Sequence, residues 1–327
     1  MDTFLERTAN ACASELWGRD RAYSTLMREL WGSPDIWNAK KTYLQIANRL
    51  GVDEETVRNR VKRLKDTGFL LGWRVIPNPA LLGLTFSLVL LELEDPSSKE
   101  QSISRLTKSD GMINIASTFG NSLMLTALED QQHSFSKQIR EMRLGKSSEL
   151  PGLWLRPSSL RMTGLDWEIV RLLLRDAEKK MDEIAIGLRV SARTVKRRLN
   201  NMMRDSAILI MPMVNLRNTE GISYQLSVQS EKGRRPEIEK LVASRIGELI
   251  FKASDTANGS IFGFFGANVA EGNEILEWVK QLPSVRSARM SIMEKVVHAF
   301  DWLEREVDKQ VTARTRHVES PETVLAE

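Results

Sequence analysis

The spacing of apolar residues predicts one pattern at two places in the chain, residues 44–70 and residues 182–209. In each place a short apolar stretch is followed by a tight turn and then by a longer amphipathic helix. The apolar stripe of the longer helix has the spacing i, i+4, i+7 and consists of Val57, Val61 and Leu64 in the first copy and Val195, Leu199 and Met202 in the second. This order is typical of a helix-turn-helix. The sequence therefore predicts two such motifs, with second helices at Glu54–Lys65 and Ser191–Met203.

The two stretches also match residue by residue. Ile46 corresponds to Ile184, and Thr56 corresponds to Thr194, at one constant offset. Self-similarity at a fixed spacing is the sequence signature of a repeated structural unit. We interpret the chain as an internal duplication of a DNA-binding unit.

The segments after each motif alternate between strand and helix patterns. In the first half the order predicts strands at 84–93, 112–119, 122–128 and 153–157, with helices at 98–108 and 130–144. In the second half it predicts strands at 222–229, 249–254, 261–265 and 285–292, with helices at 236–245 and 270–281. The order β-α-β-β-α-β is that of a ferredoxin-like sandwich. A terminal helix is expected at Lys295–Lys309.

These patterns predict an α+β fold made of two winged helix-turn-helix units, each followed by a ferredoxin-like domain. The expected divisions are an N-terminal arm or helix (1–21), winged helix-turn-helix 1 (22–79), ferredoxin-like domain 1 (80–160), winged helix-turn-helix 2 (161–217), ferredoxin-like domain 2 (218–310) and a disordered tail (311–327).

The face of each longer helix that lies opposite its apolar stripe is rich in polar and basic residues. Arginine and asparagine can recognise base edges in the major groove, and lysine and arginine can hold phosphates. The candidate DNA-binding residues are Thr56, Arg58, Asn59, Lys62, Arg63, Arg193, Thr194, Lys196, Arg197, Asn200 and Arg204. The second helix is favoured, because Glu54, Glu55 and Asp66 reduce phosphate attraction in the first. Solvated surface positions without a ligand are the competing interpretation.

Composition narrows the functional classes. The chain of 327 residues has a net charge of +4, which permits an anionic partner such as double-stranded DNA. A single cysteine, Cys12, and three separated histidines provide no metal-ligand cluster, so neither a metal nor a cofactor is predicted. Residues 1–21 lack an apolar signal-peptide core, and the run Ala80–Leu91 is too short to cross a membrane as a helix. We therefore expect a cytoplasmic protein without a membrane partner.

The run Gly68–Leu84 resembles the Lrp/AsnC, or feast/famine, family of transcriptional regulators. It carries a glycine, an apolar wing strand, a Pro-Asn-Pro hinge and a Leu-Gly pair, which lead into a ferredoxin-like effector domain in that family. The resemblance implies regulation of transcription, sheets that pair as subunits do in the family, and a small-molecule effector. Family members often have an acidic residue after the glycine of the middle turn, whereas this chain reads Gly120-Asn121 and Gly266-Ala267. Effector ligands are therefore left unassigned, as is assembly into a homodimer or higher oligomer.

Two alternatives remain open on the same architecture. Siroheme decarboxylases share it and use a His-Asn-Tyr-x-Arg-like segment in a middle strand, where this chain has Asn114–Thr118 without histidine, tyrosine or arginine. We therefore predict no enzymatic activity and no catalytic residues. A ligand-sensing or protein-interaction module is the other alternative. For it, Trp73 in the wing is the tryptophan expected to be exposed, and His298 is expected at the core edge of a helix.

Overall fold

The computed structural model describes residues 26–30, 32–33, 36–37, 42–150, 156–219, 221–247, 249–254 and 258–319. The predicted N-terminal arm and residues 153–155 of the strand predicted at 153–157 lie outside these residues. Residues 26–30 are helical, and two short strands, β1 (Gly32–Ser33) and β2 (Ile36–Trp37), pair antiparallel after them.

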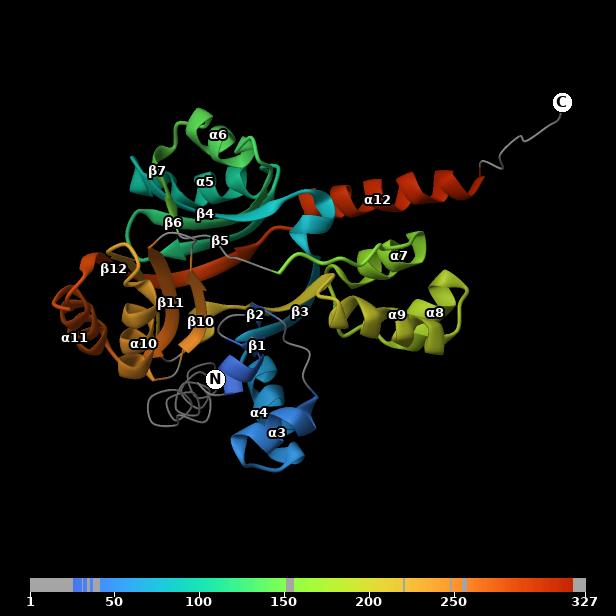
Figure 1. Ribbon diagram of the computed structural model, residues 1–327, viewed down its shortest axis with the longest axis horizontal. Coiled ribbons are helices and arrows are strands. Elements are labelled where there is room, and N and C mark those ends of the chain that lie inside the picture. The colour runs from blue at the N-terminus through green and yellow to red at the C-terminus, as the bar shows by residue number, and fades with distance from the viewer. Residues whose placement is uncertain are drawn as a thin grey trace, which may run out of the picture.

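Two clusters of helices, each followed by a strand, have the predicted order of elements (Figure 1). The first contains α3 (Tyr43–Leu50), α4 (Glu54–Asp66) and β3 (Leu70–Pro77). The second contains α7 (Gly164–Leu173), α8 (Met181–Leu188), α9 (Ala192–Arg204) and β8 (Ile208–Val214). In α4 and α9 the predicted apolar stripes are buried, which fixes the opposite faces toward the surface. We call these sets the first and the second helical cluster.

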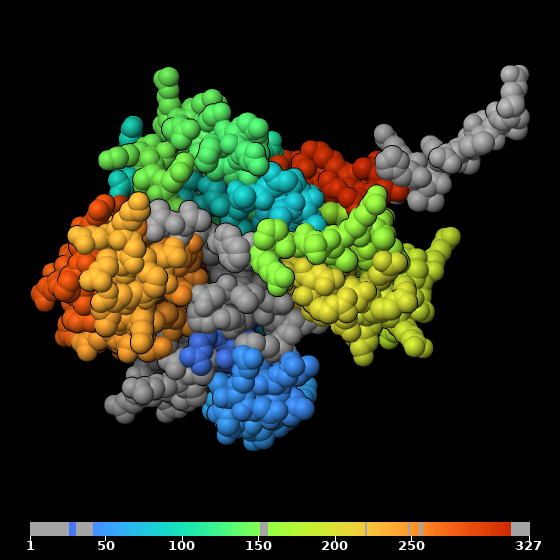
Figure 2. All heavy atoms as spheres, viewed as in Figure 1, coloured from blue at the N-terminus to red at the C-terminus, as the bar shows by residue number. Residues whose placement is uncertain are grey.

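The two helical clusters share one hydrophobic core. Strand β3 pairs with β8 in an antiparallel two-stranded ribbon that runs between them. One continuous set of buried side chains includes Ile46 and Val61 of the first cluster and Trp167, Ile184 and Leu199 of the second. Because packed cores resist deformation, the shared core holds the two clusters in a defined relation to each other. They form two lobes beside the sheet domains (Figure 2).

The remaining strands form one eight-stranded sheet with the order β10-β11-β9-β12-β5-β6-β4-β7. The first half supplies β4 (Thr85–Leu93), α5 (Lys99–Leu106), β5 (Met112–Thr118), β6 (Ser122–Glu129), α6 (Ser134–Glu141) and β7 (Gly145–Leu150). The second half supplies β9 (Ile222–Ser230), α10 (Arg235–Ile246), β10 (Leu249–Ser254), β11 (Gly259–Gly266), α11 (Val269–Lys280) and β12 (Val285–His298). Short 3₁₀ helices, η1 (Pro79–Leu82), η2 (Pro96–Ser98) and η3 (Leu216–Asn218), precede or follow strands. In both halves the strands have the ferredoxin-like order, and the α+β class is as predicted.

Strand β12 joins the two halves. Its first part pairs with β9 of its own half, and residues 293–298 pair with β5 of the other half. The sheet also curls, so that Leu88 of β4 packs with Ala253 of β10 and Ile261 of β11. The halves therefore pair through both a sheet edge and a sheet face.

Several predicted boundaries are wrong in ways that have a physical cause. The structure has a polar edge strand, β7 at 145–150, that was not predicted, and it overlaps none of the strand predicted at 153–157, which lies mostly outside the described residues. An edge strand needs only one bonded neighbour and tolerates polar residues, so its pattern resembles a loop. Likewise β12 extends to His298, so that residue lies in a strand rather than in the predicted helix.

The last helix, α12 (Asp301–Glu319), begins later than predicted and takes in residues 311–319 of the expected disordered tail. Leu303, Val307 and Val311 bury its inner face in the core shared by the helical clusters. Within the described residues, no helix has both the length and the apolar character needed to cross a membrane.

Candidate nucleic-acid interface

Helix α9 is formed by a tight turn, a side-chain cap and a buried stripe. The turn before it passes through Arg189, which has the left-handed backbone conformation with φ 54°. Ser191 then caps the helix, because its Oγ accepts a hydrogen bond of 3.1 Å from the backbone N–H of Thr194. Val195, Leu199 and Met202 are buried. This local structure fixes which side chains point away from the molecule.

The outward face of α9 is basic and has no acidic residue on the helix. Its exposed members are Arg193, Lys196, Arg197, Asn200 and Arg204. Arg204 contacts Asp205 at 3.5 Å, whereas Arg193, Lys196 and Arg197 have no ion pair within the described part of the chain. The inward cation, Arg198, lies 3.4 Å from the buried carboxylate of Asp166 on α7. The helix thus separates one structural arginine from a row of exposed polar and basic side chains.

Helix α4 has the same construction but a different surface. The Asp53 carboxylate caps it and accepts a hydrogen bond of 2.6 Å from the Thr56 N–H, and the hydrogen bonds from Thr56 hold the pKa of Asp53 below its usual value. Arg58, Asn59 and Lys62 are exposed. However, Arg58 pairs with Glu54 at 2.8 Å and approaches Glu55 at 3.7 Å. These carboxylates offset a cation that would otherwise face a phosphate.

Two of the candidate residues have internal roles, and a third is only partly exposed. The Thr56 hydroxyl donates to Asp53 at 2.9 Å, and the Thr194 hydroxyl lies 2.9 Å from that of Ser191. Both threonines therefore complete helix caps. Arg63 is half-buried rather than fully exposed. The remaining eight candidates lie on exposed helix faces.

Contacts outside the core also join the two helical clusters. Lys65 at the end of α4 pairs with Glu178, which precedes α8, at 2.7 Å. Asn218 donates to the Thr67 carbonyl at 2.9 Å, beside Gly68 in its left-handed conformation. The prediction that Trp73 is exposed is wrong, because it is 8% accessible and its ring lies 5.1 Å from the Lys65 ammonium. The wing strand packs between the clusters, and all of its residues except Leu71 are buried.

A buried polar cluster at the centre of the molecule was not predicted. Arg74 of β3, 1% exposed, donates to the carbonyls of Ala299 and Ile113 and to Asn114 Oδ1, at 2.9 to 3.1 Å. The Nδ1 atom of His298 lies 2.8 Å from the same Asn114 oxygen, which assigns the proton to Nδ1. Burial lowers the pKa of Arg74 to about 9. Burial, and secondarily the charge of Arg74, lower the pKa of His298 to about 3, partly offset by the Val214 carbonyl.

This cluster connects β3, β5 and β12, three strands that are distant in sequence. The cluster brings a histidine and an arginine next to Asn114. That residue begins the stretch Asn114–Thr118, which contains neither residue type in the sequence. No local signal could have shown this, because the three residues meet only through strand pairing. Arg74 is buried, whereas Asn114 and His298 are partly exposed, and their hydrogen bonds join the three strands.

The exposed basic face, the helix-turn arrangement and the paired sandwiches define a helix-turn-helix protein with ferredoxin-like domains. No protein-family profile matches the chain. Over 83 residues, 25% of this chain and 56% of the relative, it is 36% identical to the HTH-type transcriptional regulator Ptr1 of Methanocaldococcus jannaschii. Over 70 residues, 21% of this chain and 47% of the relative, it is 27% identical to the uncharacterised HTH-type transcriptional regulator PH0061 of Pyrococcus horikoshii. The chain spans about half the length of these curated relatives.

Among solved structures, the siroheme decarboxylase NirDL aligns with 91% of this chain and with all of its own chain. The TM-score is 0.55 and the sequence identity is 14%, so this likeness concerns the fold alone. The names of the two sequence relatives support a resemblance to helix-turn-helix transcriptional regulators.

Proposed function

We propose that the protein is a sequence-specific DNA-binding regulator of transcription that binds DNA mainly through α9. The observation that carries this proposal is the exposed face formed by Arg193, Lys196, Arg197 and Asn200, on a helix without an acidic residue. A helix of this kind fits the major groove, where arginine pairs with guanine and asparagine with adenine. Its relatives' names as transcriptional regulators support the same assignment.

In this proposal α4 is the second recognition helix, and it contributes less. Asn59 is its base-reading candidate, and Lys62 contacts phosphate, while Glu54 and Glu55 hold Arg58. The shared core and the Lys65–Glu178 pair restrict the distance between the two helices. One chain therefore prefers an asymmetric site with fixed spacing rather than a palindrome.

The proposal gives the protein no catalytic role. Siroheme-decarboxylase-like chemistry has weaker support, because Arg74, Asn114 and His298 bond to one another and to backbone carbonyls. Arg74 is 1% exposed, which limits its access to a substrate.

Selection from a randomised duplex pool tests the proposal. The purified chain would be incubated with the pool at near-physiological salt, and the retained duplexes would be sequenced. We expect one asymmetric motif, with specificity lost in R193A/R197A and one part of the motif relaxed in N59A/K62A. Retention without a motif, declining steeply with salt, would mean phosphate binding alone and would contradict sequence-specific regulation. A perfect palindrome bound by one chain would contradict the prediction that one chain prefers an asymmetric DNA site.

A further inference from the structure

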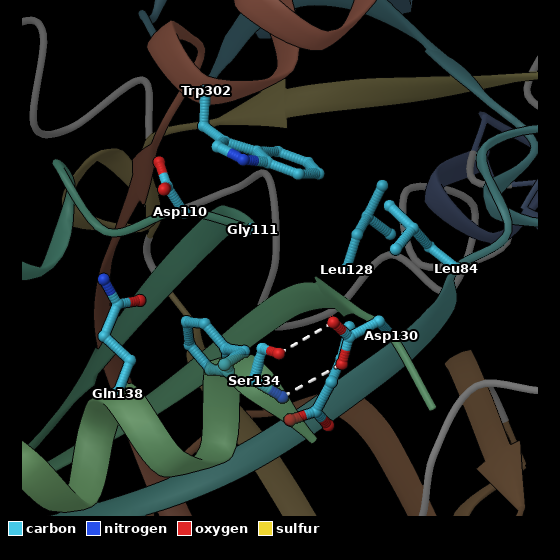
Figure 3. A pocket seen from close by; sticks show the side chains of 10 residues that line it. Leu84, Asp110, Gly111, Leu128, Asp130, Ser134, Gln138 and Trp302 are labelled. Carbon is cyan, nitrogen blue, oxygen red and sulfur yellow. Dashed lines mark hydrogen bonds between the residues drawn. The ribbon is translucent and has the colours of Figure 1, made fainter. Parts of the chain in front are cut away.

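A pocket of about 330 Å³ lies at one end of the first sandwich, beneath the start of α12 (Figure 3). It is formed by the turn before β5, the end of β6, the first turns of α6 and the indole of Trp302. The β5–β6 hairpin places this pocket at the end opposite the Gly120-Asn121 turn. Its volume is at the lower end of the range of small-molecule sites.

One part of the pocket wall is apolar. The Trp302 indole faces the space from one side, and Leu84 and Leu128 lie across from it (Figure 3). Phe135 contributes a second ring. An aromatic face has a negative quadrupole and therefore attracts cations as well as apolar groups.

Three carboxylates also line the pocket: those of Glu129 and Asp130 at the end of β6, and that of Asp110 on the other side, near Trp302 (Figure 3). Asp130 accepts hydrogen bonds from the N–H and hydroxyl of Ser134, at 3.1 and 2.7 Å. These donors are neutral, and together with the nearby charge of Lys137 they hold the pKa of Asp130 below its usual value.

The Glu129 side chain is only 5% exposed. Its Oε1 accepts from the Ser136 N–H at 2.7 Å, and its Oε2 lies 3.5 Å from the His133 ring. Asp110 pairs with Arg305 at 2.8 Å. A buried carboxylate whose close partners are an amide and an imidazole would gain from a permanent cation nearby.

We propose that this pocket binds a compact organic cation with an apolar body, such as an arylalkyl ammonium ion. The ammonium group would lie among Glu129, Asp130 and Asp110, and the apolar body would pack against Trp302 and Leu128. Charge-assisted hydrogen bonds and the indole face both favour a cation over a neutral compound of the same shape. An anion would be repelled.

A ligand bound in this pocket would also affect the DNA-binding face. This consequence rests on the proposed function. Trp302 belongs to the first turn of α12, and Leu303 and Val307 of that helix are buried against the second helical cluster. Arg175, at the end of α7, pairs with Glu304, with Nη2 and Oε2 2.8 Å apart. A ligand under Trp302 would therefore favour one position of α12 and hence of α7, which packs against α9.

Calorimetry on the full chain without DNA tests the site. The probes are phenethylamine, 2-phenylethanol and phenylacetate, which share a ring and differ in charge. We expect saturable binding of the amine with an affinity at least tenfold above that of the alcohol, and no binding of the acid. Equal binding of the amine and the alcohol, or no heat with millimolar amine, would overturn the proposal.

Two variants assign the site, and one is a control. Asp130→Asn keeps an oxygen that can accept from the Ser134 N–H but removes a charge, and Trp302→Leu removes the aromatic face. Each should weaken amine binding at least tenfold. Asp95→Asn is the matched control, because Asp95 caps η2 through Ser97 at the other end of β4. Thermal unfolding would verify folding, and amine binding unchanged in the folded D130N and W302L variants would overturn the site.

The regulatory step has a separate readout. Phenethylamine should change DNA affinity at least threefold in the native chain and not in D130N. Amine binding without any change in DNA affinity would overturn the coupling alone. Amine binding by a chain that retains no DNA would contradict the proposed function while the site stands.

Discussion

Helices α4 and α9 have similar buried faces and different exposed faces. Each has 13 residues, a side-chain cap on its third backbone N–H and three buried apolar residues one turn apart. On their surfaces, the positions of Arg193, Arg197 and Arg204 in α9 correspond to Glu55, Asn59 and Asp66 in α4. The same scaffold therefore presents one basic face and one face on which acidic and basic residues are mixed.

This difference shows that the fold and the binding surface have separate determinants. The buried stripe decides how each helix packs, and the exposed positions can vary without cost to that packing. One chain can thus carry one strongly and one weakly DNA-binding helix in a single rigid frame.

The largest expected effect is on α9. R193A/R197A should weaken DNA binding by about 100-fold or more, because two base or phosphate contacts contribute roughly 1–3 kcal/mol each. Fluorescence anisotropy against the selected duplex would measure it. The matched control is K232A/K240A, which removes two exposed cations from the second sandwich. An equal loss in this control would mean that the effect reflects overall charge.

The way the first helical cluster is anchored predicts a pH effect. Its strand β3 is held by Arg74 beside His298, whose pKa is about 3 in the folded chain against 6.5 ordinarily. The unfolded chain therefore binds a proton that the folded chain excludes, and stability falls as pH decreases below about 6.5.

Between pH 7 and pH 5 this proton should cost about 2 kcal/mol of unfolding free energy in the native chain. Urea unfolding at both pH values would measure the change. His298→Asn keeps an amide donor near the Nδ1 position and removes the titration, so its stability should depend less on pH. The same dependence in both proteins would contradict the assignment to His298.

A charge graft tests whether surface alone separates the two helices. Glu55→Arg combined with Asn59→Arg gives α4 the residues that α9 has at these positions. We expect DNA affinity to rise about tenfold, since roughly two phosphate attractions replace one repulsion. The control variant E55Q/N59Q removes the negative charge of Glu55 without adding a positive charge. Its DNA affinity therefore shows how much of the gain comes from the lost repulsion alone. An unchanged affinity would mean that α4 does not reach DNA.

The smallest expected effect concerns the first helix of each motif. Helix α3 has a capping box between Thr42 and Gln45, whereas Lys180 before α8 gives no side-chain cap. Thr42→Ala should lower the unfolding free energy by about 1 kcal/mol, and Lys180→Thr should raise it by up to about 1 kcal/mol. Urea unfolding would compare them, and changes of the same sign would contradict this account.

The helices were predictable wherever an apolar stripe and a cap occurred together. Val57, Val61 and Leu64 and the cap Asp53 define α4 to within a residue, because helix periodicity and capping are local properties. Strand β7 was not predictable, because Gly145–Leu150 is polar and is a strand only through its pairing with β4. The bounds of helix α12 were predicted wrongly because most of its residues are polar. Its few apolar residues are buried only by packing in the core that includes the second helical cluster.

By itself, the sequence determined the α+β class, the repeated helix-turn-helix pattern and which faces of α4 and α9 are exposed. These follow from periodicities of a few residues, which neighbouring side chains impose. Only the tertiary structure decided that β12 crosses from its own sandwich to pair with β5 of the other. It also placed Arg74, Asn114 and His298 together and set Trp302 over the acidic pocket. Such contacts join residues far apart in the chain, where no local pattern can show which strands and helices meet.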